Sequence, residues 1–196
     1  MAIKRIYVAP AAVLKKIAEP VPQVTDELRK LMDDMLETMY AAPGIGLAAP
    51  QVGESVRILV LDVDQKDDDE DDKDAPDDGL PKIRKPGKPQ FFVNPEIIWS
   101  SDETNIYDEG CLSVPGQYAE VERPKRVRVK FLGYDGKQQE VEADGLLATC
   151  VQHEMDHLNG ILFVDHLSTL KRDIVMRKLR KFTKDNAEDL ANSHVL

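Results

Sequence analysis

The first strongly periodic segment of the chain lies in residues 25–40, where apolar side chains recur every three or four positions. This spacing predicts a helix with a single apolar stripe, which we expect to pack into the core. Thr25 can cap its first turn, and the Pro43-Gly44 pair can end it. The stripe comprises Leu28, Leu31, Met32, Met35, Leu36 and Met39.

Two further helices are predicted nearer the C-terminus. One runs over residues 144–158, with Asp144 as its cap and Asn159-Gly160 as its end. The other begins near Ser168. Its apolar stripe is expected to comprise Leu170, Ile174, Val175, Leu179 and Phe182.

Between the first and second helices the pattern is typical of strands. Residues 56–63 and 91–95 are short apolar runs, and residues 126–132 alternate apolar and polar side chains. A GYDG turn at 133–136 leads into residues 137–143, which complete a β-hairpin.

The charge of the chain is concentrated in one segment. A length of 196 residues fits one domain, spanning residues 1–196. The net charge of −10 by itself argues against a nucleic-acid partner, but the acidic residues are not spread over the chain. Residues 64–78 hold ten acidic and two basic residues, so the rest of the chain carries only −2. We expect residues 64–89 to be a mostly disordered loop insertion between two strands, and residues 186–196 a loose C-terminal tail.

The sequence is that expected of a cytoplasmic protein. No apolar run approaches the ~18 residues that a membrane span needs, and the N-terminal segment lacks a signal-peptide cleavage site. In the cytosol the two cysteines, Cys111 and Cys150, would stay reduced and free to bind a metal ion. In an oxidising compartment they could instead form one disulfide.

The strongest chemical signal is His153-Glu154-Met155-Asp156-His157, an H-E-x-x-H pattern on a predicted helix. Residues four apart lie on one face of a helix, so both imidazoles can bind the same metal ion. Glu154 lies beside them and can reach a metal-bound water. The pattern alone is only moderately specific, because an ordinary helix can also contain two histidines.

The third metal ligand distinguishes the possible classes of enzyme. A metzincin would have a histidine where this chain has Phe163, and a thermolysin-like enzyme would have a glutamate near Arg177. Both peptidase patterns therefore fail. Cys150 is seven residues from His157, about 10 Å along a helix axis, so the two cannot bind one ion. We expect Cys150 to pack as a small apolar residue near the site.

Cys111 is the best remaining candidate for the third ligand. A thiolate in the glycine-containing segment 109–115 would complete a Cys-His-His site with a fourth position open for water. His166 and His194 remain possible ligands, although His166 is expected to be structural and His194 to lie in the tail.

Three motifs occur in order along the chain: GIGLAAPQ at 44–51, EGCLS at 109–113 and QHEMDH at 152–157. Together they resemble the bacterial-type peptide deformylases, enzymes that remove the formyl group from the initiator methionine. The resemblance covers about residues 3–184. The acidic insertion is longer than expected for that loop, but it touches none of the three motifs.

The resemblance implies an α+β fold in which mixed β-sheets wrap around a central H-E-x-x-H helix, with a further C-terminal helix. It implies Cys111, His153 and His157 as the metal ligands. The usual native metal of the family is Fe²⁺, one ion per chain, which Zn²⁺, Ni²⁺ or Co²⁺ often replaces in purified protein.

The resemblance also implies roles in catalysis. Metal-bound water attacks the formyl carbon, and Glu154 acts as general acid and base. The Gln51 side chain and the Leu112 backbone N–H stabilise the oxyanion. Substrate-binding positions next to the motifs, which would receive the methionine side chain, are Ile45, Gly46, Leu146 and Cys150.

The implied partners are N-formylmethionyl nascent peptides and, through the basic C-terminal helix, the ribosome. Residues 171–185 carry seven basic and two acidic residues, which favours docking on ribosomal RNA but also fits a solvated helix face. We expect a monomer that binds neither DNA nor membranes. The alternatives are a zinc endopeptidase, disfavoured by the ligand pattern, and a ribosome-associated metal-binding protein without catalysis, disfavoured by intact Glu154 and Gln51.

Overall fold

The computed structural model describes residues 2–67 and 84–187. Its α-helices are α1 (Asp26–Ala41), α2 (Gly145–Leu158) and α3 (Thr169–Asp185). Short 3-10 helices are η1 (Ala12–Lys15), η2 (Ala49–Val52) and η4 (Phe163–His166). The strands are β1 (Gly46–Ala48), β2 (Ile58–Leu61), β3 (Lys66–Asp67), β4 (Arg84–Lys85), β5 (Gln90–Ser100), β6 (Thr104–Cys111), β7 (Val114–Pro124), β8 (Arg126–Leu132) and β9 (Gln138–Asp144).

The three α-helices begin where the sequence predicts. The side chains of Thr25, Asp144 and Ser168 each accept a hydrogen bond from a backbone N–H of the following first turn. Each cap gives a partner to one of the N–H groups that a helix leaves free at its start. All three predicted helices are therefore confirmed, as is the hairpin formed by β8 and β9.

The strands form an antiparallel arrangement. One sheet has the order β1-β2-β5-β8-β9, while β6 and β7 form a second sheet. The ladders between the described strands are all antiparallel, and the parallel pairing recorded among these residues is an isolated bridge between Glu19 and Val56. The sheets are thus antiparallel rather than mixed. Short turns join β6 to β7 and β8 to β9, as antiparallel neighbours allow.

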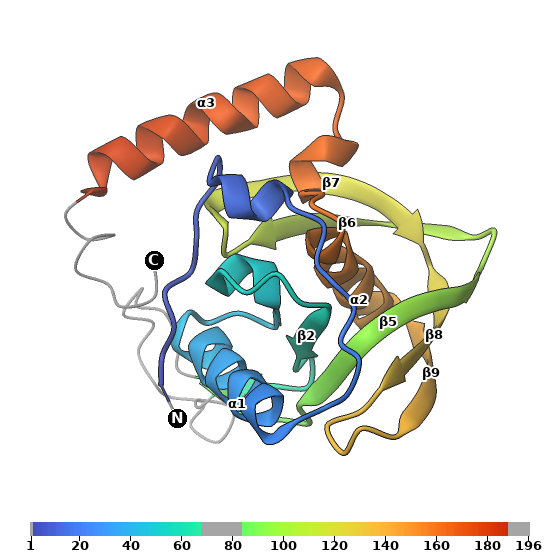
Figure 1. Ribbon diagram of the computed structural model, residues 1–196. Helices are drawn as coiled ribbons and strands as arrows, with labels where there is room; N and C mark the ends of the chain where they lie inside the picture. Colours follow the sequence, from blue (N-terminus) through green and yellow to red (C-terminus); the bar gives the residue numbers. More distant parts are fainter. Residues whose placement is uncertain (1, 68–83, 188–196) are drawn as a thin grey trace, which may run out of the picture.

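Helix α2 lies at the centre of the fold, between the two sheets (Figure 1). Its apolar side chains belong to a core cluster that includes Leu59, Phe92 and Val129 of the large sheet. Ten of its 14 residues are buried, and several of them are polar. Because burying a polar group is unfavourable without a hydrogen bond, α2 requires partners for these groups from neighbouring strands.

Helix α1 packs its methionine stripe against β1 and β2, as the sequence predicts. Met32, Met35 and Met39 have no exposed surface and share a second core cluster with Leu47 and Ile58. The stripe is therefore core packing.

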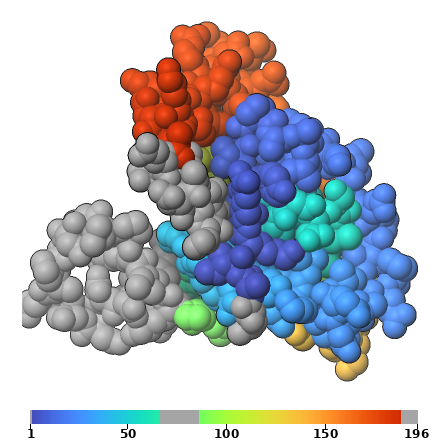
Figure 2. Space-filling view, turned by 60° about the vertical axis from the view of Figure 1, so that its left-hand side comes forward, coloured from blue at the N-terminus to red at the C-terminus, as the bar shows by residue number. Residues whose placement is uncertain are grey.

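Helix α3 lies on the outside of the molecule, over β7 and η4 (Figures 1 and 2). Val175 and Leu179 are buried, and Phe182 is half-buried against Gly116. Leu170 and Ile174 are 72% and 41% exposed, so the predicted apolar stripe is wrong at these two positions. Only the part of the helix around Val175 and Leu179 is buried against the rest of the molecule, so Leu170 and Ile174 remain in solvent.

The two ends of the acidic insertion are ordered. Strand β3 pairs with β4, and the buried carboxylate of Asp62 accepts hydrogen bonds from the backbone N–H groups of Gly87 and Lys88. Residues 64–67 and 84–89 therefore depart from the disorder expected for this segment. The β3–β4 ladder and the Asp62 carboxylate give their backbone polar groups hydrogen-bond partners.

The central part of the insertion, residues 68–83, lies outside the described residues. So do residues 188–196 of the predicted tail, including His194. No helix of the described part is long and apolar enough to cross a membrane.

Candidate metal centre

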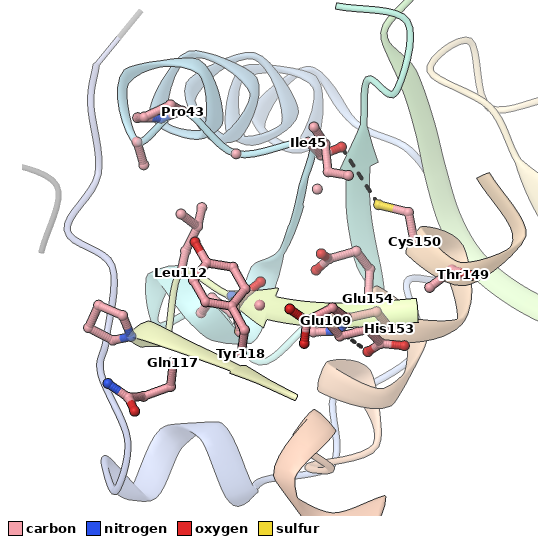
Figure 3. A pocket seen from close by; sticks show the side chains of 18 of the residues that line it. Pro43, Ile45, Glu109, Leu112, Gln117, Tyr118, Thr149, Cys150, His153 and Glu154 are labelled. Atoms are coloured by element: carbon pink, nitrogen blue, oxygen red, sulfur yellow. Dashed lines mark hydrogen bonds and ion pairs between the residues drawn. The ribbon is translucent and has the colours of Figure 1, made fainter. Parts of the chain in front are cut away.

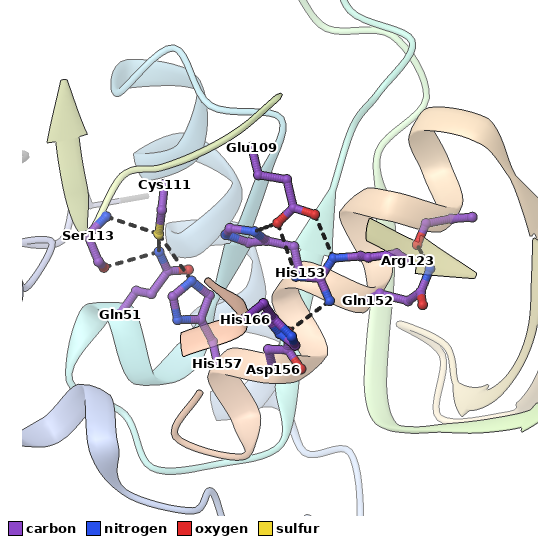
Figure 4. Close-up of polar contacts among 11 residues, drawn as sticks. Gln51, Glu109, Cys111, Ser113, Arg123, Gln152, His153, Asp156, His157 and His166 are labelled. Carbon is purple, nitrogen blue, oxygen red and sulfur yellow. Dashed lines mark hydrogen bonds and ion pairs between the residues drawn. The ribbon is translucent and has the colours of Figure 1, made fainter. Parts of the chain in front are cut away.

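Three side chains from two elements converge on one point. His153 and His157 lie one turn apart on the same face of α2, and Cys111 is the last residue of β6. Their Sγ and ring-nitrogen atoms all lie within 4.8 Å of one another (Figure 4). No second group of this kind occurs in residues 2–67 and 84–187. Both cysteines are free, so the disulfide alternative does not describe this structure.

The donor set fits a divalent metal ion. Cys111 Sγ lies 3.2 Å from His157 Nε2, close to the ~3.6 Å expected for tetrahedral S and N ligands of one ion. Burial lowers the pKa of His157 well below its ordinary range, which keeps the ring in the neutral form that binds metals. Cys111 Sγ also accepts hydrogen bonds from Gln51 Nε2 at 3.5 Å and Ser113 N at 3.4 Å, which hold the sulfur on the side of the two histidines.

Glu109 holds the first histidine in place. Its Oε2 lies 2.8 Å from His153 Nδ1, which directs the other ring nitrogen towards Cys111. Arg123, which is only 5% exposed, donates Nε–H and Nη2–H to the two oxygens of Glu109. Burial alone would raise the pKa of Glu109, but the hydrogen bonds from His153 and Arg123 outweigh it and lower the pKa. Glu109 therefore stays ionised beside the metal site.

The same guanidinium connects the site to the surface. Arg123 Nη1 donates to Asp156 Oδ2 at 2.8 Å, and His166 Nε2 lies 2.7 Å from the same oxygen (Figure 4). His166 is therefore a structural residue, as expected, and takes no part in the ligand cluster.

Sequence reasoning missed Arg123, and it assigned no role to Glu109 although that residue stands in the second motif.

Glu154 lies in the buried part of the site. It is 4% exposed, and its Oε2 has no hydrogen-bond partner within the described part of the chain. Burial raises the pKa of Glu154 to about 7. A Cβ atom on Gly46 would lie 2.5 Å from Glu154 Oε1 and 2.9 Å from Cys150 Sγ, so only glycine permits this close approach.

Gln51 and Leu112 lie on the two sides of Cys111. The Gln51 Oε1 accepts a hydrogen bond from Ala48 N at 2.8 Å, and its Nε2 donates to Ser113 Oγ at 3.1 Å. These contacts fix the orientation of the amide. Leu112 lies in the turn between β6 and β7 and lines the adjoining cavity.

The cavity next to the cluster has a volume of about 630 Å³ (Figure 3). All four predicted substrate-binding residues line it, namely Ile45, Gly46, Leu146 and Cys150. Cys150 is buried, and its thiol donates a hydrogen bond to the Ile45 carbonyl. Its position on the cavity wall, away from the ligand cluster, agrees with the helix-geometry argument.

Sequence reasoning missed the residues that form the rim of this cavity. Gln117 and Tyr118 of β7 line it opposite Ile45 and Cys150 (Figure 3). The Tyr118 ring lies over Gly110, where a Cβ atom would be 2.5 Å from Tyr118 Cε1. The glycine before Cys111 was the one sequence signal that another group approaches closely here.

An antiparallel α+β fold built around a buried H-E-x-x-H helix, with a strand-borne cysteine as third ligand, defines a metal-dependent hydrolase. Residues 3–173 match the polypeptide deformylase family, and the chain belongs to it. Enzymes of this family remove the N-formyl group from nascent peptides, and the Cys111, His153 and His157 metal site is present in this chain. This excludes the endopeptidase and the non-catalytic alternatives.

Similar proteins cover nearly the whole chain. A peptide deformylase of Phenylobacterium zucineum is 52% identical over 184 residues, covering 94% of this chain and 99% of that protein. One from Mesorhizobium japonicum is 52% identical over 187 residues, covering 95% and 97%. The crystal structure of a peptide deformylase from Legionella pneumophila has a TM-score of 0.80 and 45% identity, covering 95% and 98%.

The ligand assignment predicts different outcomes for two histidine variants. His157→Ala should lose the bound metal, because it removes one of three ligands. His166→Ala should keep one metal ion per chain, because His166 lies outside the ligand cluster and pairs with Asp156 at the far end of the hydrogen-bond chain. Metal content measured by mass spectrometry on both purified variants tests this. Equal retention of metal by the two variants would contradict the assignment.

Proposed function

We propose that this chain hydrolyses the formyl amide of N-formylmethionyl peptides with Glu154 as the proton carrier. The observation that carries the proposal is the buried Glu154 carboxylate, which lines the same cavity as Cys111 and His153 of the ligand cluster. A metal ion held by these three ligands would act as a Lewis acid and lower the pKa of a water molecule.

Glu154 is suited to moving a proton between water and the leaving amine. Its Oε2 is free of competing hydrogen bonds among the described residues, and it is shielded from solvent. In this role Glu154 takes the proton of the attacking water and then gives it to the departing amino group, so one side chain serves as base and acid.

Gln51 and Leu112 are proposed to stabilise the oxyanion that forms at the formyl carbon. The amide of Gln51 is held by Ala48 N, so Nε2 is the end that points towards the cluster. The backbone N–H of Leu112, next to Cys111, would supply a second donor. Donors that are fixed before the reaction need no reorganisation when charge develops, which is why this arrangement favours the transition state.

The methionine side chain is proposed to enter the apolar part of the cavity, between Ile45, Leu146 and Cys150. Gly46 belongs to β1, the edge strand of the large sheet, and it lines the same cavity. An extended peptide could therefore add to this edge by main-chain hydrogen bonds. A cavity of about 630 Å³ has room for a methionine and part of the chain that follows.

The proposed roles predict the effect of removing only the proton carrier. Glu154→Gln keeps the volume of the side chain and all three ligands. We expect it to retain its metal and to lose at least about 100-fold in kcat for formyl-Met-Ala-Ser, the low end of general acid–base contributions. Formate release and metal content measured on the same sample test this. Near-normal turnover with bound metal would refute the role of Glu154.

We propose Fe²⁺, one ion per chain, as the native metal. The donor set of one thiolate and two imidazoles is intermediate in softness and accepts Fe²⁺ as well as Zn²⁺, Ni²⁺ or Co²⁺. A protein that acts on nascent chains would work in the cytoplasm and, since its own chain supplies every ligand, would be active as a monomer.

The metal proposal predicts a sensitivity to air. Protein loaded anaerobically with iron should be the most active form, and its activity should decay over hours in air as the iron or Cys111 is oxidised. The zinc form should be slower but durable. Formate release over time, with Cys111 oxidation followed by mass spectrometry, measures both. A zinc form faster than fresh iron would contradict this proposal.

The ribosome is the proposed docking partner of α3. Its basic side chains, including Arg177, Lys178 and Lys181, are exposed, and the helix lies on the surface away from the large sheet (Figure 2). Contacts with RNA phosphates release counterions, so such binding falls steeply with salt.

Charge reversal tests this partner without removing the buried residues of α3. The triple variant Arg177→Glu, Lys178→Glu and Lys181→Glu should abolish cosedimentation with ribosomes at low salt while leaving formate release from free peptide unchanged. A control triple, Lys88→Glu, Arg128→Glu and Lys137→Glu, makes the same change in net charge on other exposed surfaces. Equal loss of ribosome binding in both triples would exclude α3 as the specific docking element.

A further inference from the structure

Gln65 connects the base of the acidic insertion to the wall of the peptide cavity. It belongs to the segment expected to be a loop remote from the three motifs. Instead, its Nε2 donates hydrogen bonds to the carbonyl of Gly44 at 2.8 Å and to the carbonyl of Asp62 at 2.9 Å. Gly44 is the first residue of the GIGLAAPQ motif and lines the cavity. The insertion therefore does touch a motif, which corrects the sequence-based expectation.

The segment 44–46, which Gln65 contacts through Gly44, packs closely against Leu112 and Glu154. A Cβ atom on Gly44 would lie 2.8 Å from Leu112 Cδ1, and one on Gly46 would lie 2.5 Å from Glu154 Oε1. The segment 44–46 thus lies in close contact with Leu112 and Glu154, and a shift of the segment would disturb both. Its outer side is held by the hydrogen bond from Asp62 N to the Ile45 carbonyl at 2.9 Å and by Gln65.

Gln65 projects from a rigid base. The carboxylate of Asp62, which has no exposed surface, accepts hydrogen bonds from the Tyr40 hydroxyl at 2.6 Å and from the backbone N–H groups of Asp64, Gly87 and Lys88. One buried group therefore joins helix α1 to both ends of the insertion. The backbone before Gln65 is held by the Asp64 N–H and the backbone after it by the pairing of Lys66 with Lys85, so its amide can hold Gly44 in a defined position.

We propose that Gln65 is a positioning residue for substrate binding, which holds the segment 44–46 in the conformation that receives the peptide. Without its two N–H donors, the Gly44 and Asp62 carbonyls lose a partner and the segment gains freedom. A bound peptide would restore the order of the segment at the expense of binding energy. The expected signature is a higher KM with little change in kcat.

The test compares Gln65→Glu and Gln65→Ala with the parent enzyme, each loaded with metal. Glu has nearly the shape of Gln but places a carboxylate against two carbonyl oxygens. We expect KM for formyl-Met-Ala-Ser to rise about fivefold to tenfold, as for the loss of one or two hydrogen bonds, with kcat within about twofold. The Kd of the product peptide Met-Ala-Ser, measured by calorimetry, should rise by the same factor.

Two matched controls separate this contact from other effects of the insertion. Asp64→Asn changes the charge of the exposed neighbouring side chain and should leave KM unchanged. Replacement of residues 68–83 by a short Gly/Ser linker keeps Gln65 and should also leave KM unchanged, since long loops add little closure entropy. Melting temperatures monitor folding of every variant.

The outcomes distinguish this proposal from the proposed function on which it rests. An inactive metal-loaded parent would refute the function itself. With an active parent, an unchanged KM in Gln65→Glu overturns the positioning role. A fall confined to kcat, or an equal rise in KM on replacing residues 68–83 with Gln65 intact, overturns it as well.

Discussion

The whole site depends on bringing a strand-borne sulfur against one face of a helix. Two histidines one turn apart can share a metal ion, but the third ligand must come from another element, because a helix residue further along rises out of reach. The turn after β6 places Cys111 Sγ 3.2 Å from His157 Nε2. The packing of the β6–β7 hairpin on α2 is therefore the constraint that the cavity, the motifs and the chemistry all require.

That packing is stabilised by charges that are buried with the site. Glu109 of β6, Arg123 of β7 and Asp156 of α2 form a continuous set of ion pairs. Burying ionised groups is costly unless every one is paired and hydrogen-bonded, and removing one member leaves the others uncompensated. The set therefore joins both strands of the hairpin to the helix, and through Glu109 it orients the His153 ring.

Much of this could be predicted from local sequence. The caps at Thr25, Asp144 and Ser168, the hairpin of β8 and β9, and the spacing of His153 and His157 are all encoded by residues close together in the chain. Exclusion of other positions made Cys111 the best candidate for the third ligand, with His166 and His194 still possible. The resemblance between motifs was needed to choose among them, because distance along the sequence does not give distance in the fold. Arg123, Tyr118 and Gln65 were missed for the same reason. Each acts on a residue brought near by folding, and the charge pattern around Gln65 indicated only solvation.

The central claim is that one sulfur and two imidazoles of this chain bind one metal ion at the catalytic site. X-ray absorption spectroscopy of the metal-loaded protein measures this directly. The account predicts a single sulfur near 2.3 Å with nitrogen or oxygen ligands near 2.1 Å, a sulfur that disappears in Cys111→Ser and persists in Cys150→Ser. A spectrum without sulfur, or one whose sulfur is lost with Cys150 instead, would contradict it.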